Sequence, residues 1–112
     1  MIVELPLPTT TNHTYGQRGK IRFMYKEARE WKNLATMKFR YYKGVKPTAV
    51  TIRFYLKFRR DLDGSLKLIL DSMQDAQVFE NDNDVLEMHL YKIRDRDNPR
   101  VEVEFYPQVE IN

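Results

Sequence analysis

Hydrophobic and polar residues alternate in several stretches of the chain, which is the pattern of half-buried β-strands. The longest alternating stretch runs from Ala49 to Phe58, and its apolar positions are Val50, Ile52, Phe54, Leu56 and Phe58. Shorter stretches follow at about 85–93 and 101–105, and another starts at Val3 and is interrupted by prolines at 6 and 8. We expect a strand at each place, with the last two strands paired as a hairpin through the turn at 95–99.

Two other segments have the period of a helix. In 25–42 the apolar face consists of Ala28, Trp31, Ala35, Phe39 and Tyr42, and Gly44 and Pro47 follow to end the helix. In 62–74 the apolar stripe consists of Leu62, Leu66, Ile69 and Met73. Residues 9–20 are polar and contain two glycines, so we expect a loop there.

The order of these elements is β-α-β-α-β-β, which predicts an α/β (α+β) fold with two helices packed on a mixed sheet. At 112 residues and 42% hydrophobic composition, the chain can bury a core as a single domain over 1–112. The absence of cysteine excludes disulfides and thiolate zinc sites. We expect a soluble protein with neither a signal peptide nor a membrane span, because no stretch approaches about 20 apolar residues.

The net charge of +3 conceals a strong segregation of charge along the chain. Residues 1–60 hold 14 Lys and Arg against 3 Asp and Glu, whereas residues 61–112 hold 5 against 13. Two solvated faces of opposite sign would give the same counts. A half that binds phosphates beside a half that binds cations is the arrangement that nucleic-acid enzymes need.

Asp61 and Asp63 lie where the longest predicted strand meets the second helix. Paired carboxylates supply the hard oxygen ligands that Mg²⁺ prefers. Lys67 follows one helical turn after Asp63, where it could stabilise negative charge on a phosphoryl group. Two structural alternatives stay open: either aspartate could cap the helix, and Lys67 could form an i,i+4 ion pair with Asp63.

A third carboxylate from another segment would complete a site for one or two metal ions. Asp82 is the best candidate, and Asp84 and Asp71 are less certain ones. Asp82 and Asp84 could instead be ordinary turn residues. The two histidines, His13 and His89, are far apart in the sequence and are expected to be structural. The sequence has no glycine-rich phosphate loop, and we expect no organic cofactor.

The central run resembles the RusA family of Holliday-junction resolvases. The resemblance rests on residues 59–67 (Arg-Arg-Asp-Leu-Asp-Gly-Ser-Leu-Lys), on Leu70-Asp71 and on Val78-Phe79-Glu80-Asn81-Asp82. Leu5-Pro6-Leu7-Pro8, Asn12 and Arg18-Gly19-Lys20 support it near the start. It covers nearly the whole chain, although only residues 59–82 are specific.

The resemblance implies a nuclease that resolves four-way DNA junctions by paired symmetric nicks, as a homodimer using Mg²⁺ or Mn²⁺. It assigns metal binding to Asp61, Asp63 and Asp82, with Lys67 as a further catalytic residue, and it implies a bacterial or prophage protein of the cytoplasm. The chain departs from the family pattern at Gly64, where asparagine is usual, and at Asn81, where an acid is usual. A weakened or inactive protein that binds branched DNA is therefore the alternative.

Affinity for a junction must come mainly from contacts between basic side chains and phosphates. The candidates for DNA contact are Arg18, Lys20, Arg53, Lys57, Arg59 and Arg60, together with Asn12.

Overall fold

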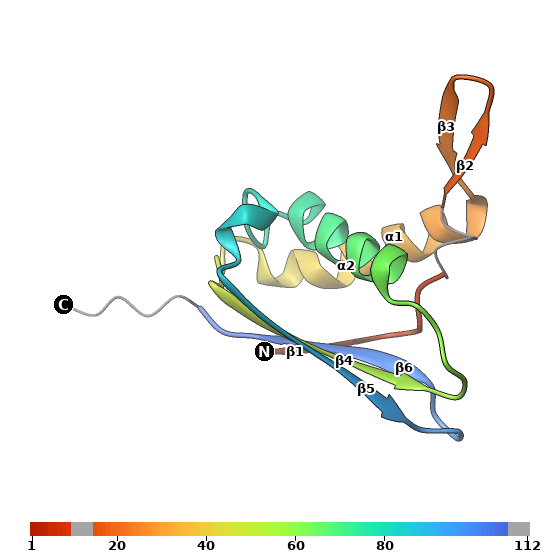
Figure 1. The fold of residues 1–112 in the computed structure, drawn as a ribbon. Coiled ribbons are helices and arrows are strands. Elements are labelled where there is room, and N and C mark those ends of the chain that lie inside the picture. The colour runs from red at the N-terminus through yellow and green to blue at the C-terminus, as the bar shows by residue number, and fades with distance from the viewer. Residues whose placement is uncertain (10–14, 108–112) are drawn as a thin grey trace.

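Two helices lie on one face of a four-stranded sheet, and a separate two-stranded hairpin projects beyond them (Figure 1). This is the predicted α+β fold. The computed structural model describes residues 1–9 and 15–107. Its helices are α1 (Lys26–Phe39) and α2 (Asp63–Asp75), with short 3₁₀ turns at Arg40–Tyr42 and Asp82–Asp84. Its strands are β1 (Ile2–Leu5), β2 (Tyr15–Arg18), β3 (Ile21–Met24), β4 (Ala49–Leu56), β5 (Glu87–Arg94) and β6 (Arg100–Phe105).

The four-stranded sheet has the order β1-β6-β4-β5, so the expected hairpin between the last two strands is wrong. β5 pairs in parallel with β4, and β6 pairs antiparallel on the other side of β4. β4 lies between β5 and β6 although these two strands follow one another in the sequence. The chain leaves the sheet after Leu56, so the 95–99 turn can pass around that end of β4 and connect β5 to β6. The amide of Asp95 donates to the carbonyl of Leu56 at that end. The crossover through α2 makes β4 and β5 a parallel β-α-β unit.

The alternation of β4 is confirmed as far as the strand extends. Val50, Ile52, Phe54 and Leu56 are buried, and they pack with Val101, Val103 and Phe105 of β6 beneath the helices. Phe58 was predicted to continue this apolar face, but its side chain is 76% exposed. The strand ends two residues before it, so the period of two no longer places Phe58 in the core.

The predicted inner face of α1 is also confirmed. Ala28, Trp31, Ala35 and Phe39 are buried. The indole Nε1 of Trp31 donates a hydrogen bond of 2.8 Å to the carbonyl of Pro6, which fastens the segment after β1 to this helix. None of the helices within 1–9 and 15–107 is long and apolar enough to cross a membrane.

The buried stripe of α2 is rotated from the predicted one. Ile69 and Met73 are buried as expected, but Leu68 joins them, while Leu62 and Leu66 are only partly buried. The rotation arises because α2 packs against α1 on one side as well as on the sheet. A row of leucines at 62, 66 and 70 is therefore left at the border of the core.

The polar segment 9–20, predicted as a loop, contains one strand of a β-hairpin. Arg18 pairs with Ile21 across a two-residue turn in which Gly19 has φ of +61°. That positive φ at the first turn position is the geometry for which glycine is suited in short hairpins. Phe23 lies over Gly16 so closely that a side chain at position 16 would collide with its ring. The hairpin extends away from the body of the molecule (Figure 1).

Candidate metal and nucleic-acid site

Asp61 and Asp63 lie on the connection from β4 into α2, where both side chains are exposed. Leu62 is the N-cap residue of α2, and no side chain makes a capping hydrogen bond there. The interpretation of either aspartate as a helix cap is therefore wrong. Neither carboxylate has a hydrogen bond or an ion pair within the part of the chain that the structure describes. Two exposed carboxylates, two residues apart in the sequence, thus remain available to a hard cation.

Lys67 does not form the alternative ion pair with Asp63. Its Nζ lies 5.3 Å from the ring centroid of Tyr15, at the base of the hairpin. The guanidinium of Arg22 lies 4.4 Å from the same ring. Two cations are thus gathered on one aromatic ring beside the start of α2, and the exposed ammonium group of Lys67 has no carboxylate partner among the residues described.

Arg60 holds the start of α2 against the N-terminal segment. Its guanidinium donates to the carbonyl of Pro8 and, at 2.7 Å, to the hydroxyl of Ser65. That hydroxyl in turn donates to the carbonyl of Thr9 at 3.1 Å. Burial lowers the pKa of Arg60 below its ordinary value. The sequence suggested Arg60 as a DNA contact, but in the folded chain its guanidinium has an internal role beside Asp61.

In the acidic loop after α2, the side chains of Asp82 and Asp84 have different roles. The carboxylate of Asp84 accepts a hydrogen bond of 3.2 Å from the amide of Asn81, and the side chain of Asn81 accepts one of 2.9 Å from the amide of Asn83. These two bonds form a capping box on the short 3₁₀ turn. Asp84 therefore has a local structural role. Asp82 is exposed and carries no such bond to a described residue.

The predicted carboxylates do not converge within one chain. Asp63 begins α2 and Asp82 follows its other end, and a helix of 13 residues is about 20 Å long. Asp71 is partly buried between them. Within residues 1–9 and 15–107, no three acidic or histidine side chains lie together as a metal site. Asp61, Asp63 and Lys67 thus belong to the start of α2, whereas Asp82 lies beyond its other end.

A basic pocket lies beside the two aspartates. It has a volume of about 420 Å³ and is lined by residues 56–59 and 92–94. Lys57 and Arg59 are predicted DNA contacts, but the sequence argument missed Lys92 and Arg94. A signal for them exists in the sequence, because apolar residues alternate through Met88 and Leu90 and the same parity then continues with two cations.

The other predicted DNA contacts have different surroundings. Arg53 lies on the sheet face that no helix covers. Its guanidinium nitrogen lies 3.1 Å from a carboxylate oxygen of Glu104 and 3.6 Å from one of Glu102. Its pKa is raised, chiefly by the hydrogen bond to Glu104. DNA would have to displace these ion pairs. Arg18 and Lys20 are exposed on the projecting hairpin, whereas Asn12 and His13 lie outside the described residues. His89 contacts Glu87, with 2.7 Å between Nε2 and Oε1.

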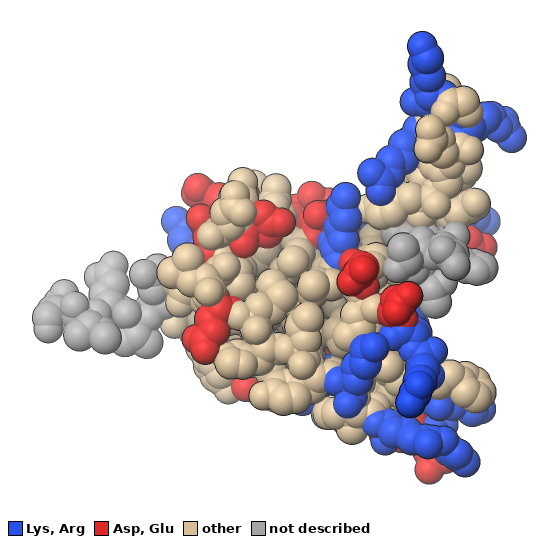
Figure 2. Space-filling model, viewed as in Figure 1, with Lys and Arg blue, Asp and Glu red and all other residues tan. Residues whose placement is uncertain are grey.

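Charges and apolar groups divide the visible surface into three zones. Figure 2 shows Lys and Arg gathered along the hairpin and near the ends of β4 and β5, with acidic side chains between these two groups. Further acidic side chains lie toward the opposite end, and a broad uncharged area lies between the two ends. Exposed apolar residues at and just before β5 contribute to such a surface: Leu86, which precedes the strand, is 81% exposed, and Leu90 is 42% exposed. Leu66 and Leu70 of α2 are partly buried against the core. We call Leu66, Leu70, Leu86, Met88 and Leu90 the apolar face.

Comparison with known proteins gives one family. The model of the family described as Endodeoxyribonuclease RusA matches residues 5–106, which is nearly the whole chain. No curated protein matches the sequence.

Proposed function

Because the chain belongs to the RusA family of endodeoxyribonucleases, we propose that it is a Mg²⁺-dependent nuclease that resolves four-way DNA junctions. The observation that carries this proposal is the pair of free carboxylates at the start of α2, Asp61 and Asp63, surrounded by cations that also lack carboxylate partners within the described chain. Carboxylates attract a metal, and the neighbouring cations attract the phosphates to be cut.

The side chains at this site suit Mg²⁺ or Mn²⁺. Asp61 and Asp63 offer oxygen ligands only, and with few protein ligands such an ion keeps several of its waters. A bound divalent ion lowers the pKa of an attacking water and neutralises charge on the leaving oxygen. Lys67 would hold its ammonium group near a phosphoryl oxygen and stabilise the charge that develops there. Tyr15 limits where that ammonium group can move, because the two groups are in contact.

The third ligand, Asp82, would come from a second copy of the chain. The apolar face includes residues from the middle of α2 and from the first half of β5, so by chain order it lies between the basic and acidic ends of the molecule. A two-fold axis through its middle and perpendicular to α2 exchanges these ends, so each copy would present Asp82 to Asp61 and Asp63 of the other. Burying Leu86, Met88 and Leu90 in that interface would also remove an exposed apolar sheet edge.

This symmetric arrangement matches the substrate class. A four-way junction has approximate two-fold symmetry, so two identical sites in a dimer could cut two opposed strands by paired nicks. Contacts to phosphates would provide most of the affinity, because junctions of different sequence share their backbone geometry. On the ground of the family, we place the protein in the cytoplasm of a bacterium, encoded by the host or a prophage.

A binding protein without nuclease activity is the second candidate. The observation in its favour is that no complete group of three carboxylates exists in one described chain. Asn81, at a position where the family usually has an acid, has a structural role as the cap of the 3₁₀ turn. Such a protein would bind junctions with a strong dependence on salt and would cut none.

Cleavage of a labelled synthetic junction distinguishes the two candidates. With Mg²⁺ the protein should nick opposed strands, and with EDTA it should not. Asp61→Asn should lower the cleavage rate at least about 100-fold, a loss typical of removing a group that stabilises the transition state. Its junction binding should be unchanged or tighter, because the change removes a negative charge that faces phosphates. Glu27→Gln removes an exposed carboxylate from α1 and should change neither property. Binding without metal-dependent nicking under any condition would favour the second candidate.

A further inference from the structure

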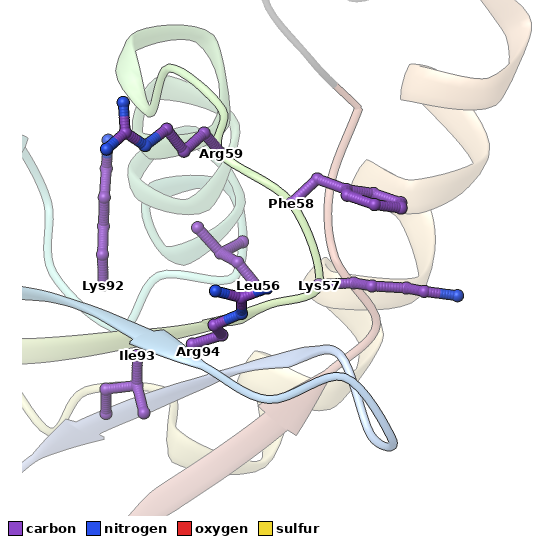
Figure 3. Close-up of a pocket in the computed structure, with 7 residues that line it drawn as sticks. All are labelled: Leu56, Lys57, Phe58, Arg59, Lys92, Ile93 and Arg94. Atoms are coloured by element: carbon purple, nitrogen blue, oxygen red, sulfur yellow. The ribbon is translucent and has the colours of Figure 1, made fainter.

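The basic pocket is built at the ends of the parallel strands β4 and β5. Figure 3 shows Arg59 and Lys92 pointing toward one another, with the guanidinium of Arg94 beside Leu56. Lys57 and Phe58 extend in the opposite direction, and Ile93 points to the other face of the sheet. The part of the pocket that could enclose a ligand is thus formed by three cations around an apolar side chain.

None of these three cations has a carboxylate partner in the described part of the chain. Gathering like charges costs electrostatic free energy, and the cost rises beside a low-dielectric surface such as the Leu56 side chain. An anion bound among them would remove that repulsion. The contrast with Arg53 and Arg100 is clear, because each of those guanidinium groups lies against carboxylates of β6.

The strand register makes the position of Lys92 and Arg94 unusual. They pair with Phe54 and Leu56, so they belong to the side of the sheet that faces the helices. Earlier positions of the same parity in β5 are the apolar Met88 and Leu90. Inward-pointing charges can protect a sheet edge from pairing. These two cations, however, lie at one end of β5 and line the same pocket as Arg59, two residues before Asp61, so an anion bound there would lie near all three.

We propose that Arg59, Lys92 and Arg94 form a phosphate site that holds a backbone phosphate of the strand being cut, next to the scissile one. This inference rests on the proposed function, since it places the DNA strand relative to Asp61 and Asp63. Arg59 precedes Asp61 by two residues, a separation of at most about 7 Å along the chain. A strand could therefore contact the pocket with one phosphate and the carboxylates with a neighbouring one, which would fix its direction through the site.

The acidic end of a second copy is the competing occupant of this pocket. In the proposed dimer that end lies close to the basic end of the other copy. Two of its carboxylates already have local partners, because Asp84 is held by the amide of Asn81 and Glu87 contacts His89. A third, Asp82, is assigned to the metal in the proposed function. A DNA phosphate has no such internal partner, and this favours it as the ligand.

Salt-dependent binding tests the phosphate site. The probe is a fluorescent four-way junction whose arms are closed by loops, so that every phosphate is internal, and the buffer contains EDTA to prevent cleavage. Each phosphate contact that is lost should lower the slope of log K against log salt by about 0.9. Lys92→Ala and Arg94→Ala should each show this loss, whereas Lys92→Arg should retain the wild-type slope. Arg29→Ala removes an exposed cation from α1 and is the control for net charge.

The outcomes separate this inference from the proposed function. If the wild type cuts junctions but Lys92→Ala and Arg94→Ala behave like Arg29→Ala, the phosphate site is wrong and the nuclease remains. If the wild type never cuts but the two slopes fall, the phosphate site stands and the nuclease fails. A slope that falls only on junctions with free 5′-phosphate ends overturns the inference. The inference is also overturned if sedimentation shows that these variants no longer dimerise while the salt slope stays unchanged. That result would assign the pocket to the second copy.

Discussion

The ammonium group of Lys67 lies 5.3 Å from the ring centroid of Tyr15, and it makes no ion pair with Asp63 one helical turn away. A residue of the projecting hairpin therefore contacts the side chain to which we assign charge stabilisation. Arg22 contacts the same ring from within the hairpin. The hairpin and the start of α2 consequently meet at one aromatic side chain beside the two free aspartates.

Lys67→Ala should lower junction cleavage about 100- to 1000-fold, because it removes a cation that acts on transition-state charge. Its thermal unfolding midpoint should stay at the wild-type value, since Lys67 is exposed and the buried residues of α2 are unchanged. Rate measurements and thermal melts on the same preparation check both points. A collapsed melting transition would assign Lys67 to the fold instead.

Tyr15 should act as a positioning residue. An exposed cation–π contact contributes about 0.5–1 kcal/mol, so Tyr15→Ala should slow cleavage about two- to fivefold while Tyr15→Phe keeps the rate. In the Lys67→Ala background the Tyr15→Ala change should have no further effect on the rate, because its target is absent. Equal effects of Tyr15→Ala in both backgrounds would show that Tyr15 acts on something other than Lys67.

Arg59 and Arg60 are adjacent in sequence and should respond in opposite ways. Ser65→Ala or Arg60→Ala should lower the free energy of unfolding by about 1–3 kcal/mol, because each leaves buried polar groups without hydrogen bonds. Arg59→Ala should change it by less than about 0.5 kcal/mol, as expected for an exposed position, yet weaken junction binding. Urea unfolding and binding titrations on both variants make the comparison. Equal stability losses would contradict the separate roles.

The apolar face should be the dimer interface. Leu86→Lys places a charge on a side chain that is 81% exposed in the single chain, and it should convert dimer to monomer and abolish cleavage. Met37→Lys is the matched control, because Met37 is 68% exposed on α1, a helix that contacts α2 and β1. Light scattering and cleavage assays on both variants provide the measurement. A Leu86→Lys protein that stays dimeric would move the interface elsewhere.

The turn after β5 should lose stability in acid. The amide of Asn98 and the side chain of Arg100 donate to the Asp95 carboxylate and lower its pKa below the ordinary value of about 3.9. The ionised form is therefore favoured in the folded chain. The ionised Asp95 carboxylate contributes its full stabilisation above the pKa of the unfolded chain. This stabilisation is lost as the pH falls through the lower pKa of the folded chain. Amide NMR shifts of Asp97 and Asn98 should change below about pH 4, and Asp95→Asn should remove that change.

The sequence was sufficient for features that depend on local periodicity. The alternation of Val50 to Leu56 and the spacing of Ala28 to Phe39 identified the central strand and the first helix, because each pattern reports a single buried face. The family resemblance was carried by residues 59–82, and the match to the family model confirms it. These features needed no knowledge of how distant segments meet.

Features that depend on three-dimensional pairing were missed. The partner of β6 could not be deduced, because β4 accepts strands on both sides and a short turn favours the hairpin that does not form. The hairpin at 15–24 was hidden by the polar character of its first strand, although Gly19 marked its turn. The separation of Asp82 from Asp61 also depends on the length of α2 and on where the chain goes after it, and residue spacing alone does not report this.

Mixing two inactive variants tests the central claim most directly. Asp63→Asn and Asp82→Asn should each be unable to cut a junction in the presence of Mg²⁺. When the two chains are refolded together, each mixed dimer should contain one intact site, with Asp61 and Asp63 from one chain and Asp82 from the other, so the mixture should nick one strand of the junction. If the metal site instead lay within a single chain, every site in the mixture would remain defective. A mixture as inactive as either variant alone, while still dimeric, would contradict the account.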